Sequence, residues 1–117
     1  MNIDRLGVGP RMSKAVRHGD TIYLAGQVAD NAKEDVAGQT RQVLAKIDAI
    51  LAEAATDKSR LLSATIYLRD IATFDQMNGV WDAWVDPKNT PARATVEAKL
   101  ARPDFVVEIS VVAATKD

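Results

Sequence analysis

The C-terminal segment Phe105–Ala114 is apolar at nearly every position, yet it holds one carboxylate, Glu108, near its middle. Alternate residues of a strand point to opposite faces, and here both faces are largely apolar. A strand that is covered on both faces lies inside a packed structure, where a carboxylate is rarely buried without a partner. Glu108 therefore either has a partner or faces a cleft.

Two short runs on either side of His18-Gly19-Asp20 predict a β-hairpin within residues 12–29, with His18 at its exposed end. Gly26 interrupts the second of these strands. An isolated glycine in a strand pattern indicates a bulge or a close approach of the backbone to another group. Both explanations stay open, and the second makes Ala25-Gly26-Gln27 a candidate wall of a site.

The middle of the chain alternates between helical and strand patterns. Apolar residues recur every three or four positions in 34–55, which predicts a long amphipathic helix. Residues 59–70 read as a strand, and residues 71–86 return to helical spacing before Pro87. Strict alternation after Pro91 predicts another strand over 92–100.

Two tryptophans, Trp81 and Trp84, lie on the second predicted helix. At this spacing, large aromatic residues are typical of a core or a subunit interface, and we interpret them in that way.

The predicted order β-β-α-β-α-β-β over residues 1–117 indicates one α+β domain, a single mixed sheet with both helices packed on one face. The other face of that sheet would be left uncovered. Because the last strand is apolar on both sides, we expect a second copy of the chain to cover the bare face.

The composition excludes several classes of function. The 117 residues carry 15 basic and 16 acidic side chains, and a net charge of -1 argues against a nucleic-acid surface. With no cysteine and one histidine, the chain has no disulfide, no thiol nucleophile and no set of soft metal ligands. Charged residues near the N-terminus and the lack of a long apolar run predict a cytoplasmic protein with no membrane segment.

Arg93 and Glu108 are the candidate chemical pair. If the last two strands form a hairpin around Leu100–Pro103, Arg93 falls opposite residues 108–111. The two side chains could then form a buried ion pair that holds the sheet together. Alternatively, Arg93 binds a substrate carboxylate and Glu108 handles protons beside it. The spacing does not separate these interpretations.

Four segments in this order and spacing resemble the RidA family, also called YjgF. They are "LAGQV" (24–28), "SATIYLRDIATFDQMNGVWDAWV" (63–85), "TPARATVEAKL" (90–100) and "VVEISVVAA" (106–114). The "WDAW" helix and the compact N-terminus look most like the YoaB-like branch of that family. The resemblance covers nearly the whole chain.

The resemblance implies a homotrimer of chorismate-mutase-like subunits, whose sheets form a barrel with three clefts between subunits. It also implies an enamine/imine deaminase that hydrolyses 2-imino acids to 2-keto acids and ammonia without a metal or cofactor. Arg93 matches the family's carboxylate-binding arginine, and Glu108 matches its acidic residue in the last strand.

The resemblance further implies that Thr95, Ala25 and Gly26 line the pocket. The chain departs from the family pattern at Thr95, commonly cysteine, at Ala25, commonly serine, and at Arg11-Met12, where an aromatic residue is usual. A non-catalytic trimer that binds a small keto or imino acid, or another protein, is therefore the alternative function.

Overall fold

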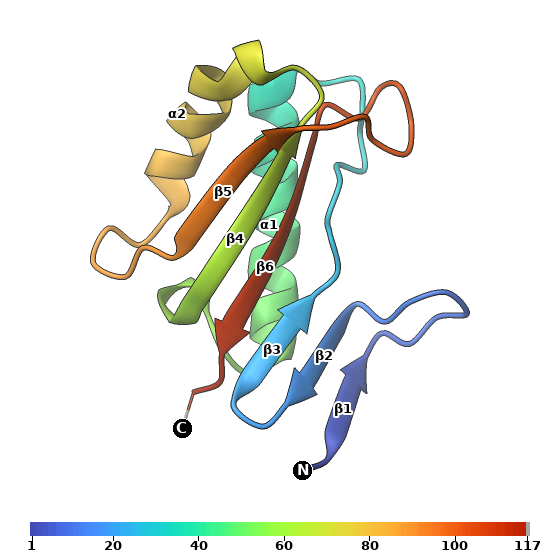
Figure 1. The fold of residues 1–117 in the computed structure, drawn as a ribbon, viewed down its shortest axis with the longest axis vertical. Coiled ribbons are helices and arrows are strands. Elements are labelled where there is room, and N and C mark those ends of the chain that lie inside the picture. The colour runs from blue at the N-terminus through green and yellow to red at the C-terminus, as the bar shows by residue number, and fades with distance from the viewer. Residues whose placement is uncertain (117) are drawn as a thin grey trace.

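The computed structural model describes residues 1–116 and contains a six-stranded mixed sheet with two α-helices (Figure 1). The strands lie side by side in the order β1-β2-β3-β6-β4-β5. In chain order the elements are β1 Ile3–Leu6, β2 Ala15–His18, β3 Thr21–Leu24, α1 Val36–Glu53, a 3₁₀ turn Lys58–Arg60, β4 Leu61–Leu68, a 3₁₀ turn Ile71–Thr73, α2 Phe74–Trp84, β5 Ala92–Glu97 and β6 Val107–Ala114.

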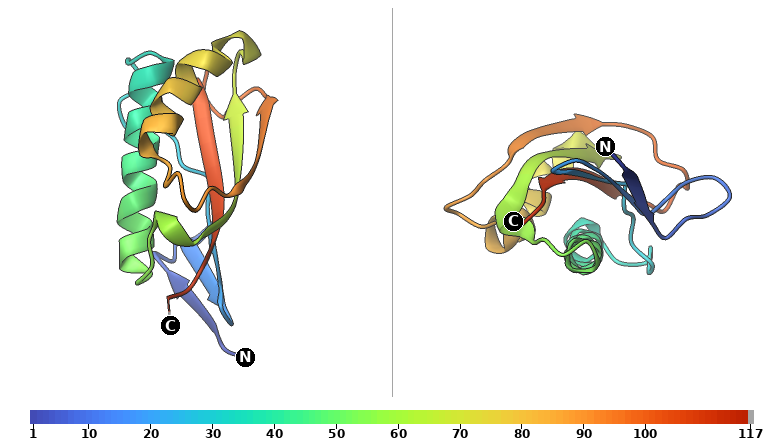
Figure 2. Two further views of the ribbon diagram at one scale, coloured as in Figure 1. Left: turned by 90° about the vertical axis from the view of Figure 1, so that its left-hand side faces the viewer. Right: turned by 90° about the horizontal axis from the view of Figure 1, so that it is seen from below.

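Both helices pack on the same face of the sheet, as the sequence pattern predicts (Figure 2). Helix α1 begins after Asp35, whose carboxylate accepts a hydrogen bond of 2.9 Å from the Gly38 amide. Such a cap satisfies an amide that has no partner inside the helix. Among the described residues, no helix is long and apolar enough to cross a bilayer.

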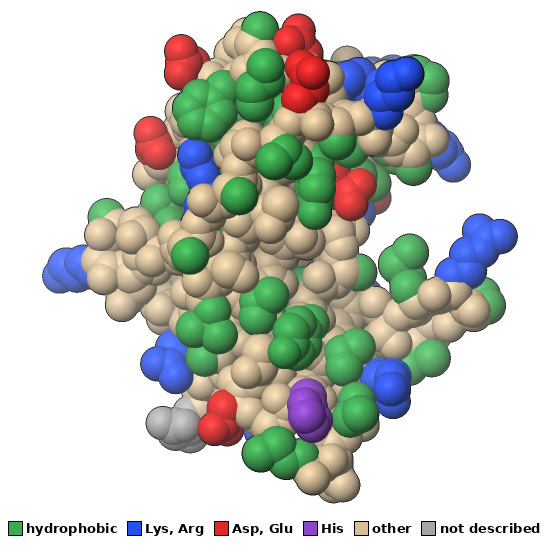
Figure 3. All heavy atoms as spheres, viewed as in Figure 1, with side chains coloured by type: hydrophobic (Ala, Val, Ile, Leu, Met, Phe, Trp, Pro, Cys, Tyr) green, Lys and Arg blue, Asp and Glu red, His purple; other side chains and the backbone are tan. Residues whose placement is uncertain are grey.

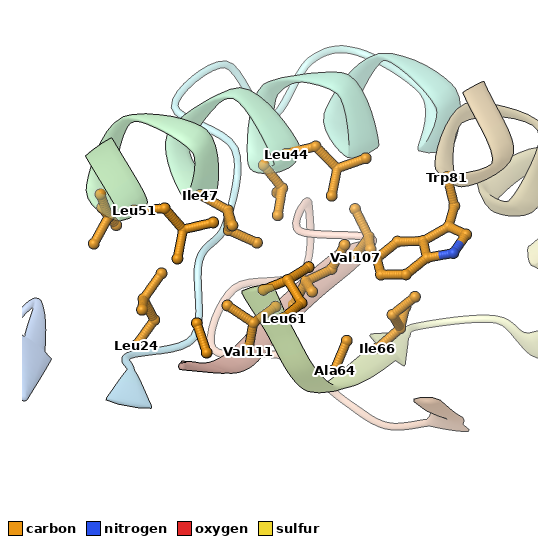
Figure 4. Close-up of a cluster of buried hydrophobic side chains, with 14 of the residues drawn as sticks. Leu24, Leu44, Ile47, Leu51, Leu61, Ala64, Ile66, Trp81, Val107 and Val111 are labelled. Carbon is orange, nitrogen blue, oxygen red and sulfur yellow. The ribbon is translucent and has the colours of Figure 1, made fainter. Parts of the chain in front are cut away.

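The core lies between the helices and the sheet (Figure 4). Trp81 is buried there, and the half-buried ring of Trp84 packs against it at 5.3 Å between ring centroids. The interpretation of Trp81 as a core residue is confirmed. The apolar residues at every other position of β6 supply the sheet side of this core, namely Val107, Ile109, Val111 and Ala113.

The predicted hairpin between the last two strands is wrong. β5 pairs in parallel with β4, and β6 lies between β3 and β4, antiparallel to both. Helix α2 forms the crossover that parallel neighbours require, so it brings β5 back beside β4. The connection between β5 and β6, residues 98–106, is long enough to carry the chain past β4.

The first strand, β1, is an addition to the predicted order, which becomes β-β-β-α-β-α-β-β. It pairs antiparallel with β2 at the edge of the sheet. Three of its four residues are exposed, so it has no buried face that would leave an alternating hydrophobic signal in the sequence.

The sheet face opposite the helices is bare (Figures 2 and 3). Hydrophobic side chains are spread over the face that Figure 3 shows. Tyr23 is 49% exposed and Val96 is 42% exposed, although both lie on strands. From the strand registers, residues on this face include Tyr23, Val112, Ser110, Glu108, Tyr67, Thr65, Ala94 and Val96.

Candidate functional site

Glu108 lies on the bare face of the sheet, in the middle of β6 and directly opposite Tyr67 of β4. It lines a hollow of about 450 Å³, next to the segment that follows the C-terminal end of β5. The strands position it there by simple alternation, because its neighbours Val107 and Ile109 point into the core. The residues that line the hollow are Gly26, Tyr67, Ala98, Lys99, Leu100, Ala101, Glu108 and Ser110.

Gly26 sits at a bulge that brings backbone close to Glu108. Between the pairs Tyr23–Val112 and Gln27–Ile109, the β3 side advances four residues while β6 advances three, which leaves one extra residue. A Cβ atom built on Gly26 would lie 3.1 Å from the carboxyl carbon of Glu108. The glycine therefore makes both a bulge and a close approach, the two explanations that its sequence context suggested.

Ala25 is the neighbour of this glycine, but it does not line the hollow. Its amide donates a hydrogen bond of 3.0 Å to the Lys14 carbonyl, so it ties the bulge to the β1–β2 side of the sheet. Met12, in the loop between β1 and β2, is exposed and likewise lies outside the hollow.

Arg93 points the other way, toward the helices. Its position in β5 is opposite the buried Ala64 of β4. The guanidinium Nη1 donates a hydrogen bond of 2.8 Å to the Asn78 side-chain oxygen of α2. The guanidinium carbon also lies 5.2 Å from the ring centroid of Trp81 and 5.8 Å from that of Phe74. Cations over aromatic faces at such distances are attracted by the ring quadrupole.

Thr95 shares this face with Arg93, two residues along β5 and opposite the buried Ile66. Its hydroxyl oxygen is buried and has no hydrogen-bond partner among residues 1–116. Buried polar groups are nearly always paired in native proteins, so this hydroxyl is a candidate to bind a group that the described residues do not supply.

Four of the five predicted site residues therefore form two groups within one chain, and Ala25 belongs to neither. Arg93 and Thr95 lie on the helix side of the edge strand β5, whereas Gly26 and Glu108 lie on the bare face. Arg93 pairs with Ala64 of β4 and Glu108 pairs with Tyr67, three residues further along the same strand. Because β4 lies between β5 and β6, the Arg93 and Glu108 Cα atoms are two strand spacings apart as well, which gives roughly 14 Å.

The structure thus corrects two expectations about this pair. Arg93 and Glu108 are not near neighbours within the chain, and residues 1–116 contain no ion pair between them. The reason is β4, which pairs with both strands and keeps them apart. The interpretation of the pair as a buried ion bridge within one subunit is wrong.

The sequence reasoning missed several residues at these positions. Tyr67, Lys99 and Ser110 join Glu108 only because β4 and the 98–101 segment meet at β6, which the strand order decides. Asn78 did carry a signal, since it is a polar residue on the apolar stripe of a helix. The described residues contain no cluster of three or more side chains suited to holding a metal ion.

A second hollow, of about 580 Å³, lies between α1 and α2 on the other side of the sheet. It is lined largely by small and apolar residues, and it contains none of the predicted site residues. We place the candidate site in two parts. Glu108 lies with Lys99 and Tyr67 in the hollow on the bare face. Arg93 lies on the helix side, on the same strand as the unpaired buried hydroxyl of Thr95.

Comparisons with known proteins agree with this assignment of the fold. The family model described as "Endoribonuclease L-PSP" matches residues 3–115. A RutC family protein of Haemophilus ducreyi is 46% identical over 112 residues, which cover 96% of both chains. The RutC family protein YoaB of Escherichia coli is 44% identical over 114 residues, covering 97% of this chain and 99% of YoaB.

Solved structures show the same likeness. A crystal structure of a YjgF family member from Neisseria meningitidis matches with a TM-score of 0.97 and 51% identity, over 100% of this chain and 98% of that one. A family model that spans almost the whole chain, together with relatives of this identity and coverage, shows that the protein belongs to the RidA (YjgF) family, in its YoaB-like branch.

Proposed function

We propose that the protein is an enamine/imine deaminase that hydrolyses 2-imino acids to 2-keto acids and ammonia. The observation that carries this proposal is the arrangement of Arg93, whose guanidinium donates one hydrogen bond to Asn78 and leaves its other N–H groups uncommitted among residues 1–116. A planar guanidinium with a free edge binds carboxylates through two parallel hydrogen bonds.

We further propose that the working unit is a homotrimer, with each site completed across a subunit interface. The bare sheet face carries exposed hydrophobic side chains that another copy would cover. Because β5 is an edge strand, Arg93 and Thr95 can meet the neighbouring subunit there. That subunit would supply Glu108 and Gly26 from its own bare face.

The proposed reaction needs few catalytic groups. A protonated imine is already electrophilic, so the protein needs only to hold the substrate carboxylate and place one water molecule. Glu108 would accept a proton as water adds to the imine carbon. It would return that proton to nitrogen and then accept the proton of the carbinolamine hydroxyl as the C–N bond breaks. The products are the keto acid and ammonia, which leaves with that last proton as ammonium.

The test is to generate 2-iminopropionate and several bulkier imino acids in situ and to compare keto-acid release with and without the protein. We expect faster release with the wild type and little acceleration with Glu108→Ala. A matched control is Gln76→Ala, which changes an exposed side chain of α2 away from Arg93.

The alternative, a binding module without catalysis, gives a different result in the same experiment. Keto acids would bind with a measurable affinity that depends on Arg93, yet no imino acid would be hydrolysed faster than in buffer. That combination would overturn the deaminase and establish the binding function.

A further inference from the structure

We propose that Asn78 is a positioning residue, which presets the guanidinium of Arg93 to bind a carboxylate. The inference rests on the proposed function, because Arg93 is the group that binds the substrate carboxylate there. Asn78 itself does not touch the reacting atoms. It acts through its hydrogen bond of 2.8 Å to Nη1 of Arg93.

Helix α2 holds the guanidinium at three points. Phe74, Asn78 and Trp81 are spaced four and three residues apart, so they share one face of the helix. The two rings lie 5.8 and 5.2 Å from the guanidinium carbon, while the Asn78 oxygen fixes Nη1. The hydrogen bond and the two ring contacts together restrain the orientation of the guanidinium plane. No single one of these contacts would do so alone.

The helix that holds Arg93 is itself anchored in the core. Met77 and Trp81 of the same helix are buried in the core, at 0% and 5% exposure. A free arginine side chain loses much rotational freedom when a ligand fixes it, and that loss weakens binding. Because α2 has already restrained Arg93, a carboxylate binds without that loss.

The choice of asparagine is itself informative. An aspartate here would accept the same hydrogen bond, but its charge would neutralise the guanidinium and compete with an incoming carboxylate. The amide oxygen orients Nη1 and leaves the positive charge for the ligand. Arg93 forms no ion pair among the described residues, which agrees with this division of roles.

A purely structural role for Asn78 makes a different prediction. The hydrogen bond would then only attach α2 to the edge strand β5, and any acceptor of the same shape would serve. Asn78→Asp would restore what Asn78→Ala loses. Under our proposal, Asn78→Asp restores stability but does not restore carboxylate binding.

The experiment measures binding of a 2-oxo acid, which cannot turn over, by calorimetry and by tryptophan fluorescence, since Trp81 lies beside Arg93. We expect Asn78→Ala to weaken binding by about tenfold, the typical effect of losing one hydrogen bond to a charged group. Asn78→Asp should weaken binding at least as much while keeping the wild-type melting temperature. Gln76→Ala, on the other side of α2, should bind as the wild type does.

Kinetics with an imino acid give a second readout. Both Asn78 variants should raise KM by about tenfold and leave kcat within a few-fold, because the lost interaction acts on the carboxylate. The amide of the 2-oxo acid, which has no carboxylate, should bind all variants equally weakly.

Wild-type affinity in Asn78→Ala, or full recovery of affinity in Asn78→Asp, would overturn the positioning role. So would failure of the wild type to bind any 2-oxo acid. Binding that depends on Asn78 without any hydrolysis of imines would refute the deaminase and leave the positioning role established.

Discussion

Arg93 and Glu108 project from opposite faces of one sheet, with β4 between the strands that carry them. Arg93 faces α2 and bonds to Asn78, while Glu108 faces the bare side next to Gly26. One subunit therefore cannot bring both side chains to the same small ligand. A site that uses both residues needs two copies of the chain.

Subunit mixing tests that requirement. Arg93→Ala and Glu108→Ala should each be inactive alone, but a mixture that is unfolded and refolded together should regain activity. In a trimer with three equivalent interfaces, random equal mixing makes about a quarter of the sites intact. Sedimentation should show a trimer in every sample, and no recovery in mixed trimers would contradict a shared site.

Arg93→Lys and Glu108→Gln should separate binding from chemistry. Lysine keeps the charge and loses the planar fork, so kcat/KM at low substrate should fall by about tenfold or more. Glutamine keeps the shape of Glu108 but cannot accept a proton, so kcat should fall roughly 100-fold or more while 2-oxo acid binding persists. The melting temperature of Glu108→Gln should stay near the wild-type value, since Glu108 forms no ion pair among the described residues. Arg93→Lys should lose no more stability than the contact with Asn78 provides. A large drop in both melting temperatures with unchanged activity would refute the catalytic assignment.

Gly26→Ala should impair activity through Glu108. The added Cβ would lie 3.1 Å from the Glu108 carboxyl carbon, so the carboxylate must move. We expect a lower kcat with a small loss of stability. The control is Gly79→Ala in α2, where a Cβ meets nothing within 4 Å. That change should raise stability by about 0.5–1 kcal/mol and leave kcat unchanged.

Thr95→Val tests the unpaired hydroxyl on β5. If the hydroxyl stays without a partner in the assembled protein, the apolar replacement should be neutral or stabilising in thermal unfolding. If a ligand or the neighbouring subunit supplies the partner, as we expect, Thr95→Val should weaken 2-oxo acid binding or trimer formation, and Thr95→Ser should restore it. If Thr95→Val and Thr95→Ser bind the 2-oxo acid and form trimers equally well, the hydroxyl has no such partner.

Acid should weaken the anchoring of the C-terminal segment. Hydrogen bonds from Lys116, at 2.6 Å, and from Ser59 lower the pKa of Asp57 from 3.8 to about 2. A carboxylate with a depressed pKa in the folded state stabilises the protein fully above pH 3.8, and this contribution is lost as the pH falls toward 2. The Asp57 and Lys116 side chains are 44% and 54% exposed, so this contribution to the free energy of unfolding should stay below about 1 kcal/mol. Asp57→Asn should remove this part of the acid dependence in urea unfolding, and an unchanged pH profile would contradict it.

Local patterns in the sequence predicted both helices and every strand except β1. The three-and-four spacing in α1 and α2 predicted which sides of the helices are buried. The period of two in β6 put Glu108 on the face opposite Val107 and Ile109, but with both faces apolar it left open which face meets the core. The isolated Gly26 indicated a bulge or a close approach of the backbone, and the structure shows both. These features depend on local periodicity and local backbone preferences, which a single sequence carries.

Which strands are neighbours depends on long-range packing. Pairing of β5 with β4, and insertion of β6 between β3 and β4, follow from how α2 and the 98–106 segment pack, not from any short pattern. For that reason the sequence suggested that Arg93 and Glu108 meet within one chain, and the fold placed them on opposite faces. The Asn78 contact depends on the same packing, because the distance between α2 and β5 is set by the core beneath them.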